Sequence, residues 1–138
     1  MTMSETAQPV IVCAAIVLHQ QKVLLTLRPQ DKRLGGYWEF PGGKLEVGEA
    51  PEAALQRELR EEIDIQVDIE RLLKSVHHRY EWGDVRIDGY LCRFTGGIIK
   101  HLEVADHAWV AFDQLDRFAI LPADQPFVEW LQKQHQDF

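Results

Sequence analysis

The chain has 138 residues, the size of one domain, and its 46% hydrophobic and 27% charged residues are ordinary for a globular protein. Its 15 Lys and Arg are outnumbered by 22 Asp and Glu, which gives a formal net charge of −7. This charge argues against sequence-independent binding to nucleic acid, which needs a basic surface. It allows a small phosphate ligand if a metal ion carries the positive charge.

Neither a membrane span nor an export signal is predicted. The chain has no apolar run of about 18 residues, and its start, MTMSETAQP, lacks the basic and apolar regions of a signal peptide. Cys13 and Cys92 each lie in an apolar run, which favours two buried free thiols in a reducing cytoplasm, with one disulfide as the alternative. We therefore expect a cytoplasmic protein with a flexible tail over residues 1–8 and a single domain over residues 9–138.

Two strands are predicted near the N-terminus. Residues 10–18, VIVCAAIVL, are rich in β-branched side chains, and residues 23–27 resume the pattern after a polar turn, so the pair is expected to form a hairpin. Residues 29–36 hold a proline, three charged residues and a closing Gly-Gly, which predicts a loop. A short segment over residues 37–40 then leads into Pro41-Gly42-Gly43.

A helix is predicted over residues 51–63. Pro51 suits a first helical turn, where its missing N–H is no loss. Leu55, Leu59 and Ile63 recur every four residues and form one apolar stripe, the face that a helix buries.

The second half of the chain adds strands and a last helix. The strands are expected over residues 72–82 and 85–94, around the turn signal Gly83-Asp84, and over residues 108–112, and the helix over residues 122–134. The aromatic residues of the first two strands are interpreted as packing of that hairpin, not as a nucleic-acid platform; they are Tyr80, Trp82 and Tyr90. The order of elements indicates an α/β fold in which helices pack on a mixed sheet.

Three carboxylates share one face of the predicted helix. At about 100° per residue, Glu58, Glu61 and Glu62 fan over roughly 100° of the helix surface. Like charges at this spacing repel, so the arrangement gains nothing unless a cation binds, and oxygen donors suit Mg²⁺ or Mn²⁺. The alternative is a solvated acidic face. An Arg57 able to hold Glu49 would be an odd choice on such a face, so the metal site is preferred.

The acidic cluster belongs to a longer pattern over residues 43–65. Its fixed positions are Gly43, Glu49, Arg57, Glu58, Leu59, Glu61, Glu62 and Ile65. The pattern resembles the Nudix box, except that the family has Gly where this chain has Asp64. Asp tolerates the positive φ expected after a helix end at a cost of about 1 kcal/mol, and no metal ligand is lost, so the departure hardly affects activity.

Segments on both sides of the box extend the resemblance. Residues 38–44 and 121–126 look like the MutT branch, which includes nucleoside triphosphate pyrophosphohydrolases acting on 8-oxo-dGTP and on CTP-type nucleotides. The likeness spans about residues 10–132. It implies the Nudix fold, an α/β/α sandwich with a mixed β-sheet, and a Nudix domain over residues 9–138.

The resemblance also implies roles for the box residues. It places Mg²⁺, with Mn²⁺ as a possible substitute, on the Gly42 carbonyl, Glu58, Glu61, Glu62 and Glu103. Arg57 and Glu49 would orient the helix and its carboxylates. Lys44 would contact phosphate, with a solvated loop lysine as the alternative, and Glu103 could instead be an ordinary loop carboxylate.

The implied reaction is hydrolysis of a nucleoside triphosphate to a monophosphate and pyrophosphate. A triphosphate brings about four negative charges, which the metal must bridge while a carboxylate or a metal-bound hydroxide activates water for in-line attack. Glu58 is the first choice for the base and Glu103 the second. Sequence does not separate them.

The likeness places Arg28, Phe40 and Asp124 around the nucleobase, as a hydrogen-bonding arm, a packing ring and a polar reader. Each has an ordinary alternative: Phe40 could belong to the core, and Asp124 could cap the last helix. The carboxylate of Asp124 can accept from the cytosine amine or from the N7–H of 8-oxoguanine, so it leaves the base open.

The expected function is a Mg²⁺-dependent pyrophosphohydrolase that clears (oxidised) nucleoside triphosphates such as 8-oxo-dGTP. Its expected partner is a small nucleotide, with no nucleic acid and no membrane. The alternatives are CTP or 5-methyl-dCTP as substrate, another substrate such as ADP-ribose or a dinucleoside polyphosphate, and a Nudix-fold binding module without catalysis. Binding modules usually lose a box glutamate or the arginine, and this chain keeps all of them.

Overall fold

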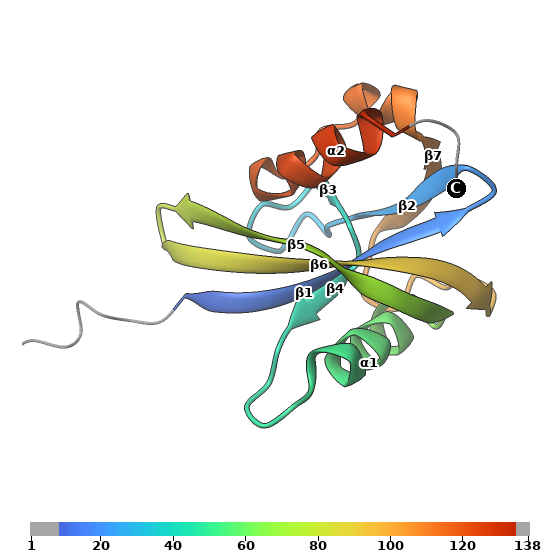
Figure 1. The fold of residues 1–138 in the computed structure, drawn as a ribbon. Helices are drawn as coiled ribbons and strands as arrows, with labels where there is room; N and C mark the ends of the chain where they lie inside the picture. Colours follow the sequence, from blue (N-terminus) through green and yellow to red (C-terminus); the bar gives the residue numbers. More distant parts are fainter. Residues whose placement is uncertain (1–8, 135–138) are drawn as a thin grey trace, which may run out of the picture.

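A computed structural model describes residues 9–134, and a mixed β-sheet runs through their centre with one α-helix on each face (Figure 1). Helix α1, Pro51–Ile63, covers one face of the sheet, and helix α2, Gln125–Gln132, covers the other. The predicted arrangement of helices on a mixed sheet is confirmed. The tail expected over residues 1–8 lies outside the described residues.

The sheet is built around β1, Val10–His19, which runs parallel to β6, Gly83–Gly96. Five strands follow the order β3-β2-β1-β6-β5, while β4 pairs with β1 and β7 pairs with β2. All of these pairs other than β1–β6 are antiparallel. The remaining strands are β2 (Lys22–Leu27), β3 (Trp38–Glu39), β4 (Gly42–Lys44), β5 (Gln66–Tyr80) and β7 (Asp106–Ala111).

The predicted hairpin of β1 and β2 is present but short. Its strands pair at Leu18 with Val23 and at His19 with Lys22. Gln20 and Gln21 form the turn between them with φ of 51° and 66°, the left-handed conformation of a type I′ hairpin turn. Beyond the turn the strands separate, because β4 pairs with β1 and β7 pairs with β2.

Strand β5 differs most from the prediction. It begins at Gln66, not at residue 72, and ends at Tyr80, so Trp82 lies in the turn before β6. The charged pair after Ile69 breaks the regular alternation of buried and exposed side chains and hides the first half of the strand from a periodicity argument. The chain continues through it by shifting register between Ile69 and Arg71 and again further along.

The predicted C-terminal helix is divided into two parts. The segment Pro122–Asp124 forms a 3₁₀ turn, η3, and α2 follows it. A second 3₁₀ segment that the sequence did not indicate, η2 over Phe112–Arg117, connects β7 to this region. The 3₁₀ turn matters because it positions Asp124 beside the segment that leads into β4.

Alternate side chains of the central strands fill two cores. Leu55, Leu59 and Ile63 of α1 pack on one face of the sheet, as their spacing predicted, and Phe127 of α2 packs on the other. A Cβ at Gly89 of β6 would lie 2.3 Å from the ring of Phe127, so α2 rests directly on the strand. Both cysteines are buried and unpaired, which confirms the prediction of free thiols.

Candidate active site

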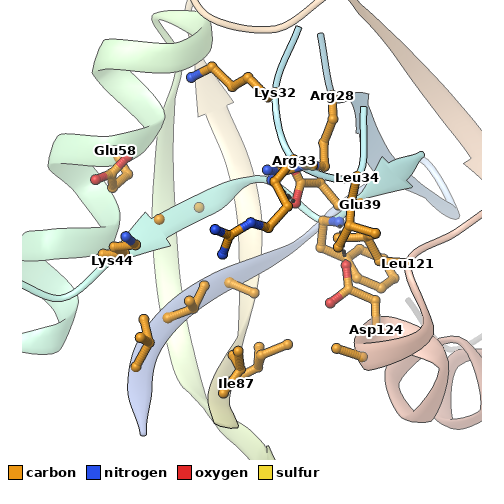
Figure 2. Close-up of a pocket in the computed structure, with 18 of the residues that line it drawn as sticks. Arg28, Lys32, Arg33, Leu34, Glu39, Lys44, Glu58, Ile87, Leu121 and Asp124 are labelled. Atoms are coloured by element: carbon orange, nitrogen blue, oxygen red, sulfur yellow. Dashed lines mark hydrogen bonds and ion pairs between the residues drawn. The ribbon is translucent and has the colours of Figure 1, made fainter. Parts of the chain in front are cut away.

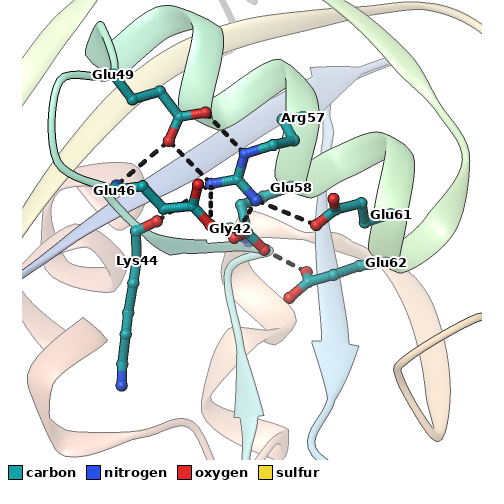
Figure 3. Close-up of polar contacts among 8 residues, drawn as sticks. All are labelled: Gly42, Lys44, Glu46, Glu49, Arg57, Glu58, Glu61 and Glu62. Atoms are coloured by element: carbon teal, nitrogen blue, oxygen red, sulfur yellow. Dashed lines mark hydrogen bonds and ion pairs between the residues drawn. The ribbon is translucent and has the colours of Figure 1, made fainter.

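The guanidinium of Arg57 donates hydrogen bonds to three carboxylates of the box and forms a longer ion pair of 3.8 Å with a fourth, Glu46 (Figure 3). Its Nε and Nη2 donate to the two oxygens of Glu49 at 2.7 and 3.0 Å. Its Nη1 donates to Glu58 Oε1 at 2.9 Å and to Glu61 Oε1 at 3.1 Å. The predicted contact between Arg57 and Glu49 is therefore present, and it holds the pKa of Glu49 below its usual value. The arrangement fixes where Glu58 and Glu61 point.

Two glycines allow the strand β4 to approach these carboxylates. A Cβ at Gly43 would lie 2.3 Å from the carboxyl group of Glu58, so the Glu58 side chain rests against bare backbone. Gly42 has φ of +151°, in the left-handed region, and a Cβ there would lie 2.0 Å from the carbonyl oxygen of Cys13. Only glycine fits at either position without displacing its neighbours.

Glu62 is a partly buried carboxylate of the same helix face. Burial, followed by the negative charges of Glu39 and Glu58, raises its pKa to about 8. The Gly42 N–H donates to Glu62 Oε1 over a long distance of 3.4 Å. Burial also raises the pKa of Glu58, although Arg57 opposes this. Without a cation, the site is thus short of positive charge.

A loop after β6 brings a further acidic residue to the same place. The backbone N–H groups of Leu102 and Glu103 donate to the Glu62 carbonyl at 3.0 and 3.2 Å. The negative charge of Glu103 contributes to the raised pKa of both Glu58 and Glu62. An all-oxygen donor set with unbalanced negative charge fits a hard divalent cation such as Mg²⁺ or Mn²⁺.

A cavity of about 560 Å³ extends from this cluster across the sheet toward α2 (Figure 2). Glu58, Glu62 and Glu103 line one end of it, together with Lys44 and the backbone of Gly42. We call these residues, with Arg57, Glu49, Glu61 and Gly43, the glutamate site. The other end, which we call the distal pocket, is lined by Arg28, Glu39, Phe40, Tyr80, Trp82 and Asp124. Among the predicted site residues, Glu49, Arg57 and Glu61 do not line the cavity.

Asp124 lies almost fully buried in the distal pocket, with 4% of its surface exposed. Its Oδ2 accepts a hydrogen bond from the Phe40 N–H at 3.1 Å. Although Asp124 precedes the first residue of α2, its side chain makes no capping bond to that helix, so the capping alternative is wrong. Burial, followed by the charge of Glu39, raises its pKa to about 8.

Phe40 is a core residue that also lines the cavity. It is buried and packs edge-to-face on Phe127 of α2 at 6.2 Å between ring centroids, so it belongs to the core. It also lines the cavity, and its N–H holds Asp124. The backbone of a core residue thus positions the polar residue of the pocket.

Glu39 is a site residue that the sequence analysis missed. Arg28 Nη1 donates to both of its carboxylate oxygens at 3.2 and 3.3 Å, and Arg28 Nε donates to the Arg33 carbonyl at 2.9 Å. Burial raises the pKa of Glu39 despite the Arg28 guanidinium. The signal available in the sequence was the position of Glu39 between two aromatic residues, Trp38 and Phe40. A carboxylate in such an apolar segment needs a charged partner if it is buried.

The rim of the distal pocket is aromatic. Tyr80 and Trp82 are stacked, with centroids 5.3 Å apart and planes 7° from parallel, and the Arg33 guanidinium lies 4.4 Å from the Trp82 ring centre. The Tyr80 hydroxyl accepts from the Ala123 N–H at 3.3 Å. Interpreting these rings as hairpin packing was therefore incomplete, because both line the cavity. Tyr90 lies in the core under α1, as expected of packing.

Comparison with known proteins agrees with this geometry. The NUDIX domain model matches residues 8–131. A CTP pyrophosphohydrolase of Escherichia coli is 30% identical over 118 residues, which cover 86% of this chain and 87% of that protein. An 8-oxo-dGTP diphosphatase of Proteus vulgaris is 47% identical over 70 residues, 51% of this chain and 62% of that protein. The crystal structure of a MutT Nudix hydrolase from Burkholderia pseudomallei superimposes with a TM-score of 0.80 at 28% identity, covering 89% and 98% of the two chains.

The family match and these relatives define a hydrolase of phosphoric anhydride bonds. The chain belongs to the NUDIX domain family. The predicted Nudix fold and the likeness to MutT-type enzymes are thereby confirmed, and the binding module without catalysis is set aside. The family typically uses a divalent metal ion and a nucleotide-type substrate. Within residues 9–134, no helix is long and apolar enough to cross a membrane.

Proposed function

We propose that this protein is a Mg²⁺-dependent nucleoside triphosphate pyrophosphohydrolase of MutT type that acts on oxidised purine nucleotides such as 8-oxo-dGTP. The observation that carries the proposal is the single cavity that joins the glutamate site to the distal pocket. One end offers oxygen donors for a metal-bound triphosphate. The other offers a buried polar side chain flanked by aromatic rings, as a nucleobase requires.

The glutamate site would hold the metal through Glu58, Glu61, Glu62, Glu103 and the Gly42 carbonyl. When bound, Mg²⁺ supplies the positive charge that neutralises the triphosphate and polarises the phosphorus. Arg57 is a positioning residue, because its guanidinium holds Glu58 and Glu61 in place. Lys44, which lines the cavity, would contact a phosphate oxygen.

A carboxylate of the cavity would take the proton from the attacking water. Glu58 is preferred, because it lines the cavity and Arg57 and Gly43 together fix its position. Glu103 is the second choice, since it lines the same end of the cavity. The products would be a nucleoside monophosphate and pyrophosphate.

Asp124 would read the base. With its pKa raised to about 8, it is largely protonated at neutral pH and can both donate and accept. A neutral carboxyl group can donate to O6 and accept from N7–H of 8-oxoguanine. Unmodified guanine presents two acceptors at these positions and leaves one contact unfavourable.

CTP or 5-methyl-dCTP is the second candidate substrate. It is favoured by the similarity to the Escherichia coli CTP pyrophosphohydrolase over most of the chain. The same neutral Asp124 could donate to cytosine N3 and accept from the N4 amine. Both candidates share the triphosphate chemistry and differ only in the base.

A panel of nucleotides tests the proposal. We expect the initial rates of nucleotide consumption at low substrate, measured by chromatography for 8-oxo-dGTP, dGTP, CTP, 5-methyl-dCTP and ADP-ribose, to rank an oxidised purine first. Hydrolysis in ¹⁸O-water with mass analysis of both products should show pyrophosphate as a direct product. Direct release of orthophosphate, or a strict preference for ADP-ribose, would contradict the proposal, and a preference for the cytosine nucleotides would select the second candidate.

Comparison of Glu58→Gln with Glu103→Gln identifies the base. The base variant should lose most of its turnover and lose the acid limb of the pH–rate profile. The other variant should keep that limb and lose metal affinity instead.

A further inference from the structure

A second cluster of potential metal ligands, separate from the carboxylates of the glutamate site, lies in the loop after β6 and at the start of β7. It consists of His101, Asp106 and His107, whose ligand atoms all lie within 4.8 Å of one another. His101 Nε2 and His107 Nδ1 are 2.8 Å apart, and Asp106 Oδ1 is 3.9 Å from His101 Nε2. Two nitrogen donors and one carboxylate oxygen therefore converge on one point at the surface.

The contact between the two imidazoles constrains what lies between them. At 2.8 Å one ring nitrogen must donate and the other must accept, so the two nitrogens share one proton. If both nitrogens carried a proton, the two N–H groups would point at each other and repel. A metal ion can replace that proton and use both lone pairs. Tetrahedral Zn²⁺ with Zn–N bonds of about 2.05 Å separates its ligand nitrogens by about 3.3 Å, so the rings need to part by only about 0.5 Å.

The backbone that carries the cluster is already held. Asp106 and His107 pair with Leu27 and Thr26 of β2, and the His107 N–H donates to Asp106 Oδ1 at 2.7 Å. On the other side of the cluster, the N–H groups flanking His101 donate to carbonyls at the end of α1: Lys100 to Ile63 at 3.0 Å and Leu102 to Glu62 at 3.0 Å. Binding of a metal ion would therefore require little further ordering of this backbone.

From this placement we infer that His101, Asp106 and His107 form a second metal site, selective for a Zn²⁺-class transition ion and distinct from the hard-cation site on α1. Imidazole nitrogens suit Zn²⁺, Cu²⁺ and Ni²⁺, whereas Mg²⁺ requires oxygen donors. Three protein ligands leave a fourth position for water. The ion would tie the loop over residues 97–105, which carries Glu103, to β7.

Zinc titration of the untagged protein tests the site. In excess Mg²⁺, we expect calorimetry to show one equivalent of Zn²⁺ bound. His101→Gln and His107→Gln should each weaken this binding by at least about 10-fold, since loss of even an outer partner costs that much. The control is His77→Gln, which removes an exposed histidine of β5 outside the cluster and should bind Zn²⁺ as the parent does.

A double variant, Glu58→Gln with Glu62→Gln, makes the test independent of the proposed activity. Zinc binding that survives in it and fails in the histidine variants supports the second site even if the enzyme proves to have another substrate. Zinc binding that is unchanged in both histidine variants, or that is lost only in the glutamate variant, would overturn the inference. So would an affinity weaker than millimolar.

A measurement on the unaltered chain covers the case in which a variant does not fold. On addition of Zn²⁺, the ¹⁵N resonances of the His101 and His107 rings should shift while those of His77 do not. Amide hydrogen exchange of Lys100, Leu102 and Glu103 should slow, because their bonds to α1 would open less often. Zinc that leaves the ring resonances unchanged refutes the site, and exchange that stays equally fast refutes the tie on the loop.

Discussion

The glutamate site takes all but one of its side chains from residues 42–62, whereas the distal pocket draws on the loop after β2, on β3, on the β5–β6 hairpin and on η3. In the first, helix periodicity places the carboxylates and one arginine holds them. In the second, contacts between residues far apart in the chain, such as Phe40 with Asp124, set the geometry. The geometry of the first region therefore follows from local sequence, and that of the second depends on how distant segments pack.

Removing a carboxylate of the glutamate site should have the largest effect. We expect Glu58→Gln or Glu62→Gln to lower kcat by at least about 10²-fold, roughly 3 kcal/mol of transition-state stabilisation, because a metal ligand is lost. EDTA should abolish activity, and Mg²⁺ or Mn²⁺ should restore it. Steady-state kinetics measure this, with Glu52→Gln on the first turn of α1 as the control. Near-normal turnover in both site variants would be incompatible with the metal site.

Gly43→Ala tests the glutamate site without changing any charge. The new methyl group would lie 2.3 Å from the Glu58 carboxyl group and force that side chain away. We expect metal affinity or kcat to fall by about 10- to 100-fold, the usual cost of disturbing a ligand's support, while the fold is kept. The control is Gly96→Ala, whose Cβ would make only an ordinary contact at 3.5 Å. An equal effect of both substitutions would point to general destabilisation.

Asp124→Ala tests the distal pocket alone. We expect kcat/KM for the best nucleotide to fall by about 1–3 kcal/mol and discrimination between bases to weaken, since one good base contact is lost. Phosphate chemistry should persist, because the glutamate site is untouched. The nucleotide panel described above measures the change. If the ranking of substrates stays fixed, Asp124 does not read the base and the two regions are not functionally separate.

These regions also differ in how far the sequence predicts them. The spacing of Glu58, Glu61 and Glu62, the stripe of α1 and the positive φ of Asp64, 58° in the structure, all follow from local rules. The sequence did not predict that Glu39 and the aromatic rim line the distal pocket, because their positions depend on which strands pair. The first half of β5 escaped because register shifts break the period on which strand prediction relies.

The buried carboxyl of Asp124 should make stability depend on pH. Its pKa is raised from 3.8 to about 8, so the folded state holds this proton more tightly than the unfolded chain does. The resulting stabilisation is complete below the unfolded value and is lost as the pH rises through about 8. We expect urea titrations of the metal-free protein to show a free energy of unfolding that falls as the pH rises from 3.8 to about 8.

Asp124→Asn should make that decline shallower, and the similar shift of Glu62 should preserve part of it. The exposed Asp113→Asn serves as the control and should leave the pH profile unchanged. A profile identical to the parent's in Asp124→Asn would show that Asp124 titrates normally in the folded protein.

Asp64→Gly should have the smallest effect. Glycine relieves the left-handed conformation at the end of α1 by up to about 1 kcal/mol, while the exposed ion pair of Asp64 with Lys100, at 3.2 Å, is lost. We expect the Tm to change by only a few degrees and kcat to stay the same. A large loss of activity would mean that the helix end takes part in holding the glutamate site.

The two buried cysteines can report on local opening of the fold. Burial raises the pKa of Cys13 to about 11 and that of Cys92 to about 12, so neither forms the reactive thiolate in the closed protein. They lie on β1 and β6, adjacent parallel strands beneath α1. A reagent can alkylate these thiols only after this layer has opened. At high reagent concentration, the alkylation rate of the unaltered protein therefore measures how often the centre of the sheet opens.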